Sequence, residues 1–431
     1  MERWEQFQGV YIHTPFCLRK CLYCDFPSYA GFPETVRQEY VDALCREIAF
    51  RSQERELPVA EGATIYFGGG TPTVLSTAQI GQTVACLKRY GWWRNPAEAT
   101  IEANPGTVDL EKLRALRQLG FDRISLGMQS LQDRELRALG RIHTAEQAVQ
   151  AIEEAKQAGF RRISADLMSG IPCQTVESFR NTLDRILQLN LSHISVYSLI
   201  LEEGTTLERL VASGQVELPD EETAYLMYEM TTDRLERAGL TRYEISNYAV
   251  PGEESFHNKV YWHYEPYAAF GAGACAFTGN GRRINTADVP EFIAGWKAEV
   301  VDAKEAAWKT AVPFAEWKAE PNAAVKGETE CNRKCTEPVM NSSFVTDAPL
   351  WTTEELDCKT QISEAMIMGL RMTEGVDLHK MQQRFGIDVL AYYREALQSL
   401  PEQQMLEYVD GHLRLTPYGM RYGNRVFEIF V

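Results

Sequence analysis

The chain of 431 residues contains no run of about 18 consecutive apolar residues, so its sequence predicts no transmembrane helix. Its first residues, MERWEQFQGV, lack the basic-then-apolar pattern of a signal peptide. We therefore expect a cytoplasmic protein. In that compartment its 10 cysteines would stay as thiols or bind metal rather than pair as disulfides.

Basic residues are fewer than acidic residues in this chain. Lys and Arg total 44 against 60 Asp and Glu, which gives a formal net charge of −16. An acidic surface repels phosphate backbones, so a nucleic-acid-binding protein is disfavoured, including one that modifies tRNA. Hydrophobic residues make up 45% of the chain and charged residues 24%, a globular composition that excludes a disordered protein.

Residues 1–250 alternate between short β-rich runs and longer helical patterns. We expect strands at 10–13, 64–67, 100–102, 123–126, 162–167 and 193–201, and helices at 34–51, 79–90, 110–119, 145–158, 176–189 and 221–238. Six βα units in series predict a parallel sheet with right-handed crossovers. Because a closed barrel needs eight units, the predicted fold class is α/β with an open, partial TIM-like barrel. Its functional groups should lie at the carboxyl ends of the strands.

Two further regions follow this barrel. We expect residues 251–352 to connect the barrel to the C-terminal domain. In this region the motif Trp296–Glu299 recurs as Trp317–Glu320, in an amphipathic helical stretch that precedes a polar insertion. Residues 353–431 predict an α+β domain that resembles a winged helix. Its pattern is helices at 359–372, 377–385 and 388–399, strands at 405–409 and 413–415, and a last helix at 417–430. The acidic balance of this domain favours a structural role over DNA binding.

Three cysteines follow the first predicted strand. Cys17, Cys21 and Cys24 form a C-x3-C-x2-C array. Thiolates select zinc, Cu(I) or iron–sulfur clusters, and a structural zinc site normally takes four ligands. No fourth Cys or His follows closely, and three thiolates suit a 4Fe-4S cluster that leaves one iron open to a small molecule. Cys331 and Cys335 form an isolated C-x3-C that we interpret as two exposed thiols.

Further strand ends carry residues suited to binding a polar ligand. The run Gly68–Pro72 follows the second strand, and its glycines let the backbone approach a ligand closely. Glu102, Gln129 and Asp166 follow the next strands, with Arg141 in a loop between them. Carboxylates suit hydroxyls, Arg suits a carboxylate and Gln suits an amide-like edge. Each could instead be an ordinary helix cap or surface residue, but their shared placement predicts one site.

The cysteine array together with the glycine run resembles the radical S-adenosylmethionine (SAM) superfamily. The resemblance implies a 4Fe-4S cluster whose open iron chelates SAM, and one-electron cleavage of SAM to a 5′-deoxyadenosyl radical. Nearly the whole chain is similar to the oxygen-independent coproporphyrinogen III oxidase branch, through Tyr11–Cys17, Gly170–Thr175, Tyr243–Ala249 and Gly369–Arg371. It implies SAM contacts by Tyr11, Tyr23, Gly69, Gly70, Thr71, Glu102, Gln129, Arg141 and Asp166, and more weakly by Ile200 and Phe277.

Two features depart from the oxidases of that branch. The oxidases carry a further cysteine where this chain has Phe26, and an N-terminal extension before the cluster, whereas Cys17 already belongs to the array here. Both departures match a sister group, the HemW heme chaperones, which bind heme and pass it to acceptor proteins. The resemblance implies that role, with decarboxylation of coproporphyrinogen III to protoporphyrinogen IX as the alternative. Implied partners are heme or another tetrapyrrole, an acceptor protein, and a reductant such as flavodoxin or ferredoxin.

The segment His257–Trp262 matches the H-N-x-x-Y-W pattern of that sister group and is the candidate heme-binding segment. An imidazole can bind heme iron axially, and Tyr and Trp can pack on a porphyrin face. By residue chemistry, a lone histidine more often only hydrogen-bonds within its loop. His13 and His263 are weaker candidates for the same role.

Overall fold

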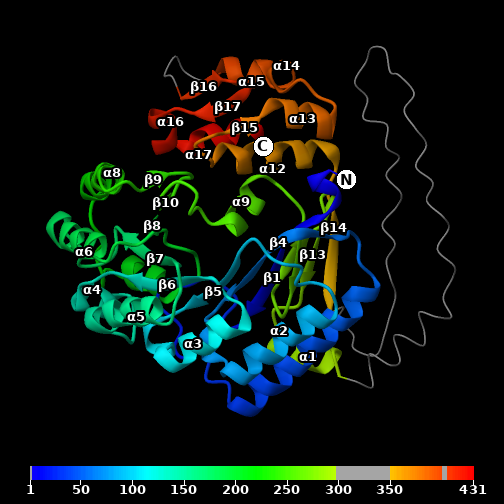
Figure 1. The fold of residues 1–431 in the computed structure, drawn as a ribbon. Coiled ribbons are helices and arrows are strands. Elements are labelled where there is room, and N and C mark those ends of the chain that lie inside the picture. The colour runs from blue at the N-terminus through cyan, green and yellow to red at the C-terminus, as the bar shows by residue number, and fades with distance from the viewer. Residues whose placement is uncertain (1, 298–349, 400–404) are drawn as a thin grey trace.

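The computed structural model describes residues 2–297, 350–399 and 405–431. Parallel strands and helices alternate through the first half of the chain (Figure 1). The strands are β1 (Phe7–Thr14), β4 (Val59–Gly69), β5 (Ala99–Ala103), β6 (Arg123–Gln129), β7 (Arg162–Ser169) and β8 (His193–Ser198). The helices are α1 (Glu34–Gln53), α2 (Thr77–Arg89), α3 (Leu110–Leu119), α4 (Asp133–Ala138), α5 (Ala145–Gln157), α6 (Val176–Gln188), α7 (Thr206–Ala212) and α8 (Glu221–Arg237). The prediction of six βα units is confirmed.

Helix caps in the sequence set where the loops after the strands end. Ser76, Asp109 and Thr144 precede α2, α3 and α5, and each side chain accepts a hydrogen bond from a first-turn backbone N–H. Thr175 does the same for α6. Three of these caps end loops that leave the carboxyl ends of strands, and Thr144 ends the loop between α4 and α5 that carries Arg141. The caps therefore fix the loops that carry the predicted site.

Six further strands from the second half of the chain extend the sheet. They are β9 (Thr241–Arg242), β10 (Asn247–Ala249), β11 (Tyr267–Phe270), β12 (Cys275–Phe277), β13 (Gly281–Asn285) and β14 (Trp351–Glu355). The strand order is β14-β13-β12-β11-β1-β4-β5-β6-β7-β8-β10-β9. Pairing is parallel from β1 to β8. Because β14 and β9 are the sheet's two edges, the barrel is open, as predicted.

Strands β11 to β13 lie in residues 251–352, which the sequence predicts only as a connection between the barrel and the C-terminal domain. β11 pairs in parallel with β1, with Tyr267 opposite Gly9, and β12 and β13 continue as antiparallel strands. These strands have 4, 3 and 5 residues, too short to show an alternating pattern between their glycine-rich turns. The stretch also contains α9 (Phe256–Trp262) and α10 (Val289–Gly295).

The chain ends in a small α+β domain with the predicted winged-helix-like order. It contains α12 (Cys358–Leu370), β15 (Val376–Asp377), α13 (Leu378–Phe385), α14 (Val389–Tyr392), α15 (Arg394–Ser399), β16 (Leu406–Val409), β17 (His412–Leu415), α16 (Pro417–Arg421) and α17 (Gly423–Phe427). The predicted last helix is divided because Tyr422, with φ −122° and ψ 29°, leaves the helical conformation. Tyr264 and Phe277 share this domain's apolar core, which joins it to the barrel.

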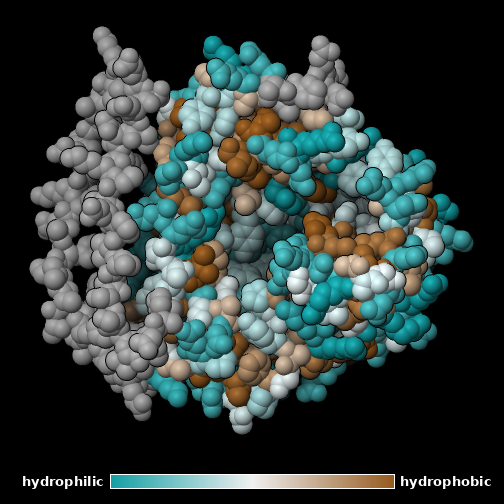
Figure 2. Space-filling model, turned by 180° about the vertical axis from the view of Figure 1, so that it is seen from behind, coloured by the Kyte–Doolittle hydropathy of each residue, from teal (hydrophilic) through white to brown (hydrophobic). Residues whose placement is uncertain are grey.

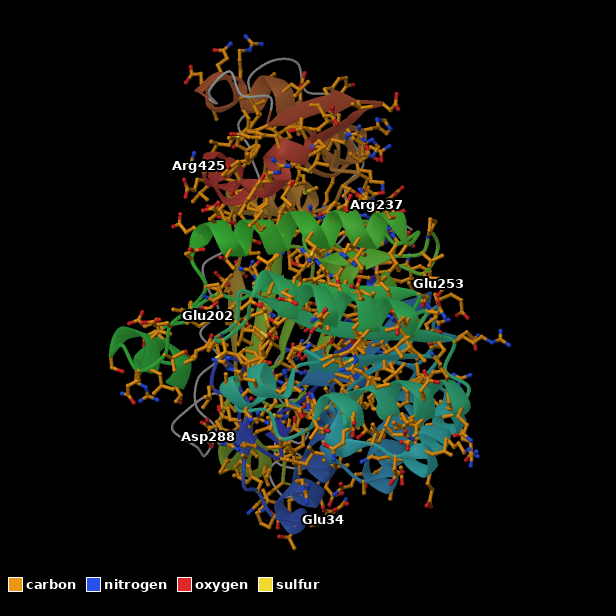
Figure 3. All side chains as sticks on the ribbon, turned by 90° about the vertical axis from the view of Figure 1, so that its left-hand side faces the viewer. Glu34, Glu202, Arg237, Glu253, Asp288 and Arg425 are labelled. Carbon is orange, nitrogen blue, oxygen red and sulfur yellow. The ribbon has the colours of Figure 1, made fainter. Side chains whose placement is uncertain are left out.

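Helix α8 lies between the barrel helices and this C-terminal domain (Figure 3), and Arg421 and Glu229 form an ion pair of 2.9 Å there. Past Glu202, the chain projects from the body of the molecule (Figure 3). Figure 2 shows the opposite face from Figure 1, which is hollowed near its centre. In the described residues, no helix is long and apolar enough to span a bilayer.

The residues that flank the insertion meet in space. The rings of Trp296 and Trp351 stack with centroids 6.0 Å apart. Leu350 packs on Gly295 so closely that an added Cβ would lie 1.9 Å from its side chain. The predicted Trp317–Glu320 repeat and the Cys331/Cys335 pair lie outside the described residues. The division at residues 250 and 352 stays a prediction.

Candidate functional site

The cysteine loop, residues 16–30, follows β1 at the carboxyl end of the sheet. It contains two short parallel strands, β2 (Phe16–Cys17) and β3 (Tyr29–Ala30). The glycine turn after β4 holds the base of this loop. The amide of Gly70 donates to the carbonyl of Thr14, and that of Thr71 donates to the carbonyl of Phe16, both at 2.8 Å. The sequence motifs predicted to form one site therefore lie side by side.

The middle of the cysteine loop is held from a second side that sequence reasoning missed. The amide of Leu22 donates to the carbonyl of Leu139 at 3.0 Å, and the amide of Leu207 donates to the carbonyl of Leu22 at 2.8 Å. Leu139 follows α4, and Leu207 lies on α7. Because these bonds join main-chain atoms that are far apart in the sequence, no side-chain pattern predicts them.

The three thiols are half-buried and have polar neighbours. The Cys17 sulfur lies 3.5 Å from Thr71 Oγ1, and an Arg141 guanidinium nitrogen donates to the Cys21 sulfur at 3.4 Å. Burial raises the pKa of the Cys17 thiol, while hydrogen bonds from Thr71 and Ser28 oppose that rise. A cation and hydroxyl donors beside sulfur stabilise a thiolate, which is the form that binds metal.

The donor set fits an iron–sulfur cluster better than a single ion. Among the residues that the structure describes, no group of three His, Cys, Asp or Glu side chains converges to hold one metal ion. Ligands of a 4Fe-4S cluster each bind a different iron, so their sulfurs need not converge on one point. Three neighbouring cysteines suit a 4Fe-4S cluster that keeps one iron open, whereas a closed structural zinc site takes four ligands.

Gly69 is required by both conformation and space. Its φ is +107°, and an added Cβ would lie 2.5 Å from the His13 ring. That ring cannot easily move, because its Nδ1 bonds to Tyr11 Oη at 3.0 Å and its Nε2 to the Pro27 carbonyl at 3.1 Å. Tyr11 and Gly69, both predicted SAM contacts, are therefore joined through His13 at the end of β1.

We expect Gly69→Ala to lower the free energy of unfolding by about 2 kcal/mol or more and to weaken SAM binding. The matched control is Gly62→Ala in the same strand, where φ is +78° but nothing lies within 4 Å of an added Cβ. The control should lose only about 1 kcal/mol, the cost of the left-handed backbone. Urea unfolding and calorimetric SAM titration measure both effects. Equal losses in the two variants would contradict the role of the His13 contact.

Arg141 links the cysteine loop to the next strand ends. Besides Cys21, its guanidinium donates to Asn104 Oδ1 at 2.5 Å and to the Gly127 carbonyl. Gln129, at the end of the same strand as Gly127, has the rare positive φ of 64°. A non-glycine residue held in that conformation marks a backbone constrained by its surroundings, which is common at functional sites. Asn104, missed by the sequence analysis, is thus part of the arrangement.

Two carboxylates face the barrel interior. Tyr66 Oη donates to Glu102 at 2.7 Å, while Ser125 and Ser195 donate to Asp166 at 2.9 and 2.8 Å. Burial raises the pKa of Glu102 to about 7, the Tyr66 hydrogen bond opposes the rise, and Asp166 adds to it. Burial also raises the pKa of Asp166, and the Ser195 and Ser125 hydroxyls counter it. Such a pair favours a ligand that brings hydroxyl donors or positive charge.

The remaining predicted SAM contacts are divided between the two ends of the sheet. Tyr23, on the cysteine loop, packs beside Leu139, and Ile200 follows β8 on the same edge and is 68% exposed. Phe277 is not brought to this edge. It pairs with Tyr267 at the start of β11, and its ring centroid lies 4.4 Å from that of Tyr264. Its position in the C-terminal domain's core gives it a packing role in this structure.

His257 lies inside the barrel with no exposed surface. Its Nδ1 hydrogen-bonds to Thr64 Oγ1 at 2.7 Å, its Nε2 hydrogen-bonds to Tyr261 Oη at 2.8 Å, and its ring stacks on Tyr66. Burial lowers the pKa of His257 to about 3, so the ring is neutral at pH 7. Iron ligation by His257 would require one of these bonds to break. The observed geometry favours the hydrogen-bonding interpretation.

The other face of α9 contacts the C-terminal domain. The Arg371 guanidinium lies over the Trp262 ring at 4.4 Å from its centroid. His263 Nε2 lies 2.7 Å from a carboxylate oxygen of Glu374. Helix α9 therefore joins the barrel interior to the C-terminal domain. The two weaker heme-ligand candidates also have hydrogen-bond partners: His263 contacts Glu374, and His13 contacts Tyr11 and Pro27.

Comparison with family models agrees with this anatomy. Residues 11–186 match the radical SAM superfamily, and residues 356–422 match the HemN C-terminal domain. The chain is 32% identical to the heme chaperone HemW of Bacillus subtilis over 98% of its own length and 99% of the relative's. It is also 32% identical to the HemW of Lactococcus lactis, over 98% and 97% of the two chains. Among solved structures, the coproporphyrinogen III oxidase HemN of Escherichia coli covers 100% of this chain and 91% of its own, with TM-score 0.75 and 21% identity.

Proposed function

Because the chain belongs to the HemW family within the radical SAM superfamily, we propose that it is a heme chaperone, which binds heme and transfers it to acceptor proteins. The observation that carries the proposal is end-to-end similarity at 32% identity, which includes the cysteine loop and the C-terminal domain together. Phe26 supports the same conclusion, since it stands where the oxidases have a further cysteine.

In this proposal Cys17, Cys21 and Cys24 hold a 4Fe-4S cluster, and Gly69 and Gly70 let SAM approach it. When bound and reduced, the cluster supplies the electron that can cleave SAM. The chain's own residues bind and orient. Arg141 keeps Cys21 beside a positive charge at 3.4 Å, and the interior carboxylates accept hydrogen bonds from SAM hydroxyls or balance its positive charge.

Coproporphyrinogen III decarboxylation is the second candidate. The shared fold is compatible with it, since the E. coli oxidase superposes with TM-score 0.75. The same fold serves both activities, so fold similarity does not choose between them.

We propose a reductant such as flavodoxin or ferredoxin for the cluster, an acceptor protein for the heme, and the cytoplasm as the compartment that keeps the cysteines reduced.

The test uses protein purified and reconstituted without air. We expect heme titration to give a saturable Soret band at one heme per chain, and transfer of that heme to an apo-acceptor to restore the acceptor's spectrum. Incubation with coproporphyrinogen III, SAM and dithionite should give no protoporphyrinogen IX above the level without protein. Repeated turnover to that product would replace the chaperone proposal with the oxidase. No saturable heme band would reject the chaperone function directly.

A further inference from the structure

Large apolar side chains stand exposed on and beside the cysteine loop. Leu18 is 52% exposed, Phe26 67% and Ile142 53%. Leu18, Arg19 and Ile142 line one pocket together with Cys21 and Arg141, so this surface adjoins the cluster site. A soluble protein can expose single apolar residues, but several together mark a binding surface.

Two cations lie on the same loop as Leu18 and Phe26. Arg19 and Lys20 are exposed, and Lys20 Nζ donates to the backbone carbonyl of Phe26 at 3.0 Å, which places the ammonium at the main chain of that residue. The pair stands out in a chain whose net charge is −16. We call Leu18, Arg19, Lys20, Phe26 and Ile142 the rim patch.

We propose that heme binds on the rim patch, with Leu18, Phe26 and Ile142 against the macrocycle and Arg19 and Lys20 paired with its two propionates. The inference rests on the proposed function and adds the place where the cargo binds. Heme is a flat apolar molecule with two carboxylates on one edge, so adjacent apolar and basic groups match both of its parts. A stable protein interface takes about 20–30 residues from each partner, whereas the rim patch has five.

The rim patch also suits a cargo that must leave. A ligand on an open surface can be passed to an acceptor without unfolding its binding site. The alternative place, at His257, is fully buried, and both ring nitrogens are already hydrogen-bonded. Heme could reach that ring only after the barrel opened and the bond to Thr64 or Tyr261 broke.

Four variants test the rim patch in the reconstituted full-length protein. Phe26→Ser and the double variant Arg19→Gln/Lys20→Gln should each weaken heme binding by about tenfold or more, because one loses apolar contact and the other loses both charge partners. The control for the first is Tyr408→Ser, an aromatic residue that is 60% exposed on β16. The control for the second is Arg114→Gln/Arg161→Gln, two exposed arginines on the outside of α3 and before β7. Both controls should bind heme like the unchanged protein.

Esterified heme gives an independent readout. Heme dimethyl ester, which lacks free carboxylates, should bind the unchanged protein about as weakly as heme binds the double variant. Iron and sulfide counts and SAM binding should stay unchanged in every variant, which separates loss of heme from loss of the cluster.

The outcomes distinguish this inference from the function on which it rests. If the unchanged protein bound no heme, the proposed function would fail before the rim patch was tested. If it bound heme and the rim variants did too, while His257→Ala lost it, heme would bind in the barrel and the rim patch would be wrong. Unaltered heme binding with slower reduction by flavodoxin would make the patch a protein-docking surface and equally overturn the inference.

Discussion

Glu102→Gln is expected to weaken SAM binding by about tenfold or more and, at the same time, to stabilise the fold above pH 7. Both effects have one cause, a carboxylate held in the barrel interior where burial raises its pKa from 4.5 to about 7. Between those pH values the unfolded chain releases this proton while the folded protein keeps it. The free energy of unfolding therefore falls as pH rises from 4.5 to 7 and levels off above it.

The neutral amide of the Glu102→Gln variant does not titrate, so it removes this pH-dependent loss of unfolding free energy. The stabilisation of the variant over the unchanged protein should grow from near zero at pH 4.5 to on the order of 3 kcal/mol at pH 7 and above. Tyr66 can still donate to the amide oxygen, so its hydrogen bond, 2.7 Å in the unchanged protein, need not be lost. Urea unfolding at several pH values, in protein without SAM or cluster, measures the slope.

Glu98→Gln is the matched control, with the opposite sign. Glu98 is fully buried, but it pairs with Arg162 at 3.0 Å and accepts from the amide of Phe256 at 3.0 Å. Burial acts to raise the pKa of Glu98, but Arg123 and Arg162 outweigh it and lower the pKa. Removing this charge leaves buried cations without their partner and should destabilise the fold by about 3 kcal/mol. Destabilisation of the Glu102 variant at pH 8, or undiminished SAM binding, would contradict the assignment of Glu102.

The second large effect concerns the thiols. The triple variant Cys17→Ala/Cys21→Ala/Cys24→Ala should lose the iron–sulfur cluster completely, from about four irons and four sulfides per chain to near none after anaerobic reconstitution. The fold should survive, because main-chain bonds from Gly70 and Thr71 to the base of the cysteine loop, and from Leu22 to Leu139, hold the loop without its sulfurs.

The control is the triple variant Cys173→Ala/Cys275→Ala/Cys358→Ala, in which cysteines outside the loop are removed. Colorimetric iron and sulfide counts, the visible absorption band and far-ultraviolet circular dichroism should match those of the unchanged protein. Retention of iron by the first variant would show that other groups bind it. Stoichiometric zinc uptake by the unchanged protein in place of iron and sulfide would remove the basis for a radical SAM assignment.

The sequence analysis predicted well what local residue patterns encode. Repeating apolar periods and helix caps such as Ser76 and Asp109 located the six βα units, and the cysteine spacing located the loop that the glycine turn supports. The placement of Glu102 and Asp166 followed from the general rule that functional groups lie at strand ends.

It predicted poorly what depends on distant partners. The bond from Leu207 to Leu22 joins main-chain atoms and leaves no mark on side-chain composition. Phe277 pairs with Tyr267 at the start of β11, which the sequence did not indicate, and its SAM contact stays a prediction. His257 lies in a motif associated with heme, but only the tertiary structure reveals that Thr64 and Tyr261 already occupy both ring nitrogens.

The stacked tryptophans at positions 296 and 351, with ring centroids 6.0 Å apart, bear on the length of the chain between them. Chain that leaves a fold and re-enters it at almost the same point imposes little on the scaffold, since each doubling of such a detour adds only about 0.6 kcal/mol of closure entropy. Because Trp296 and Trp351 fix both ends at neighbouring points, a change in the number of residues between them would leave the pairing of β13 with β14 in place.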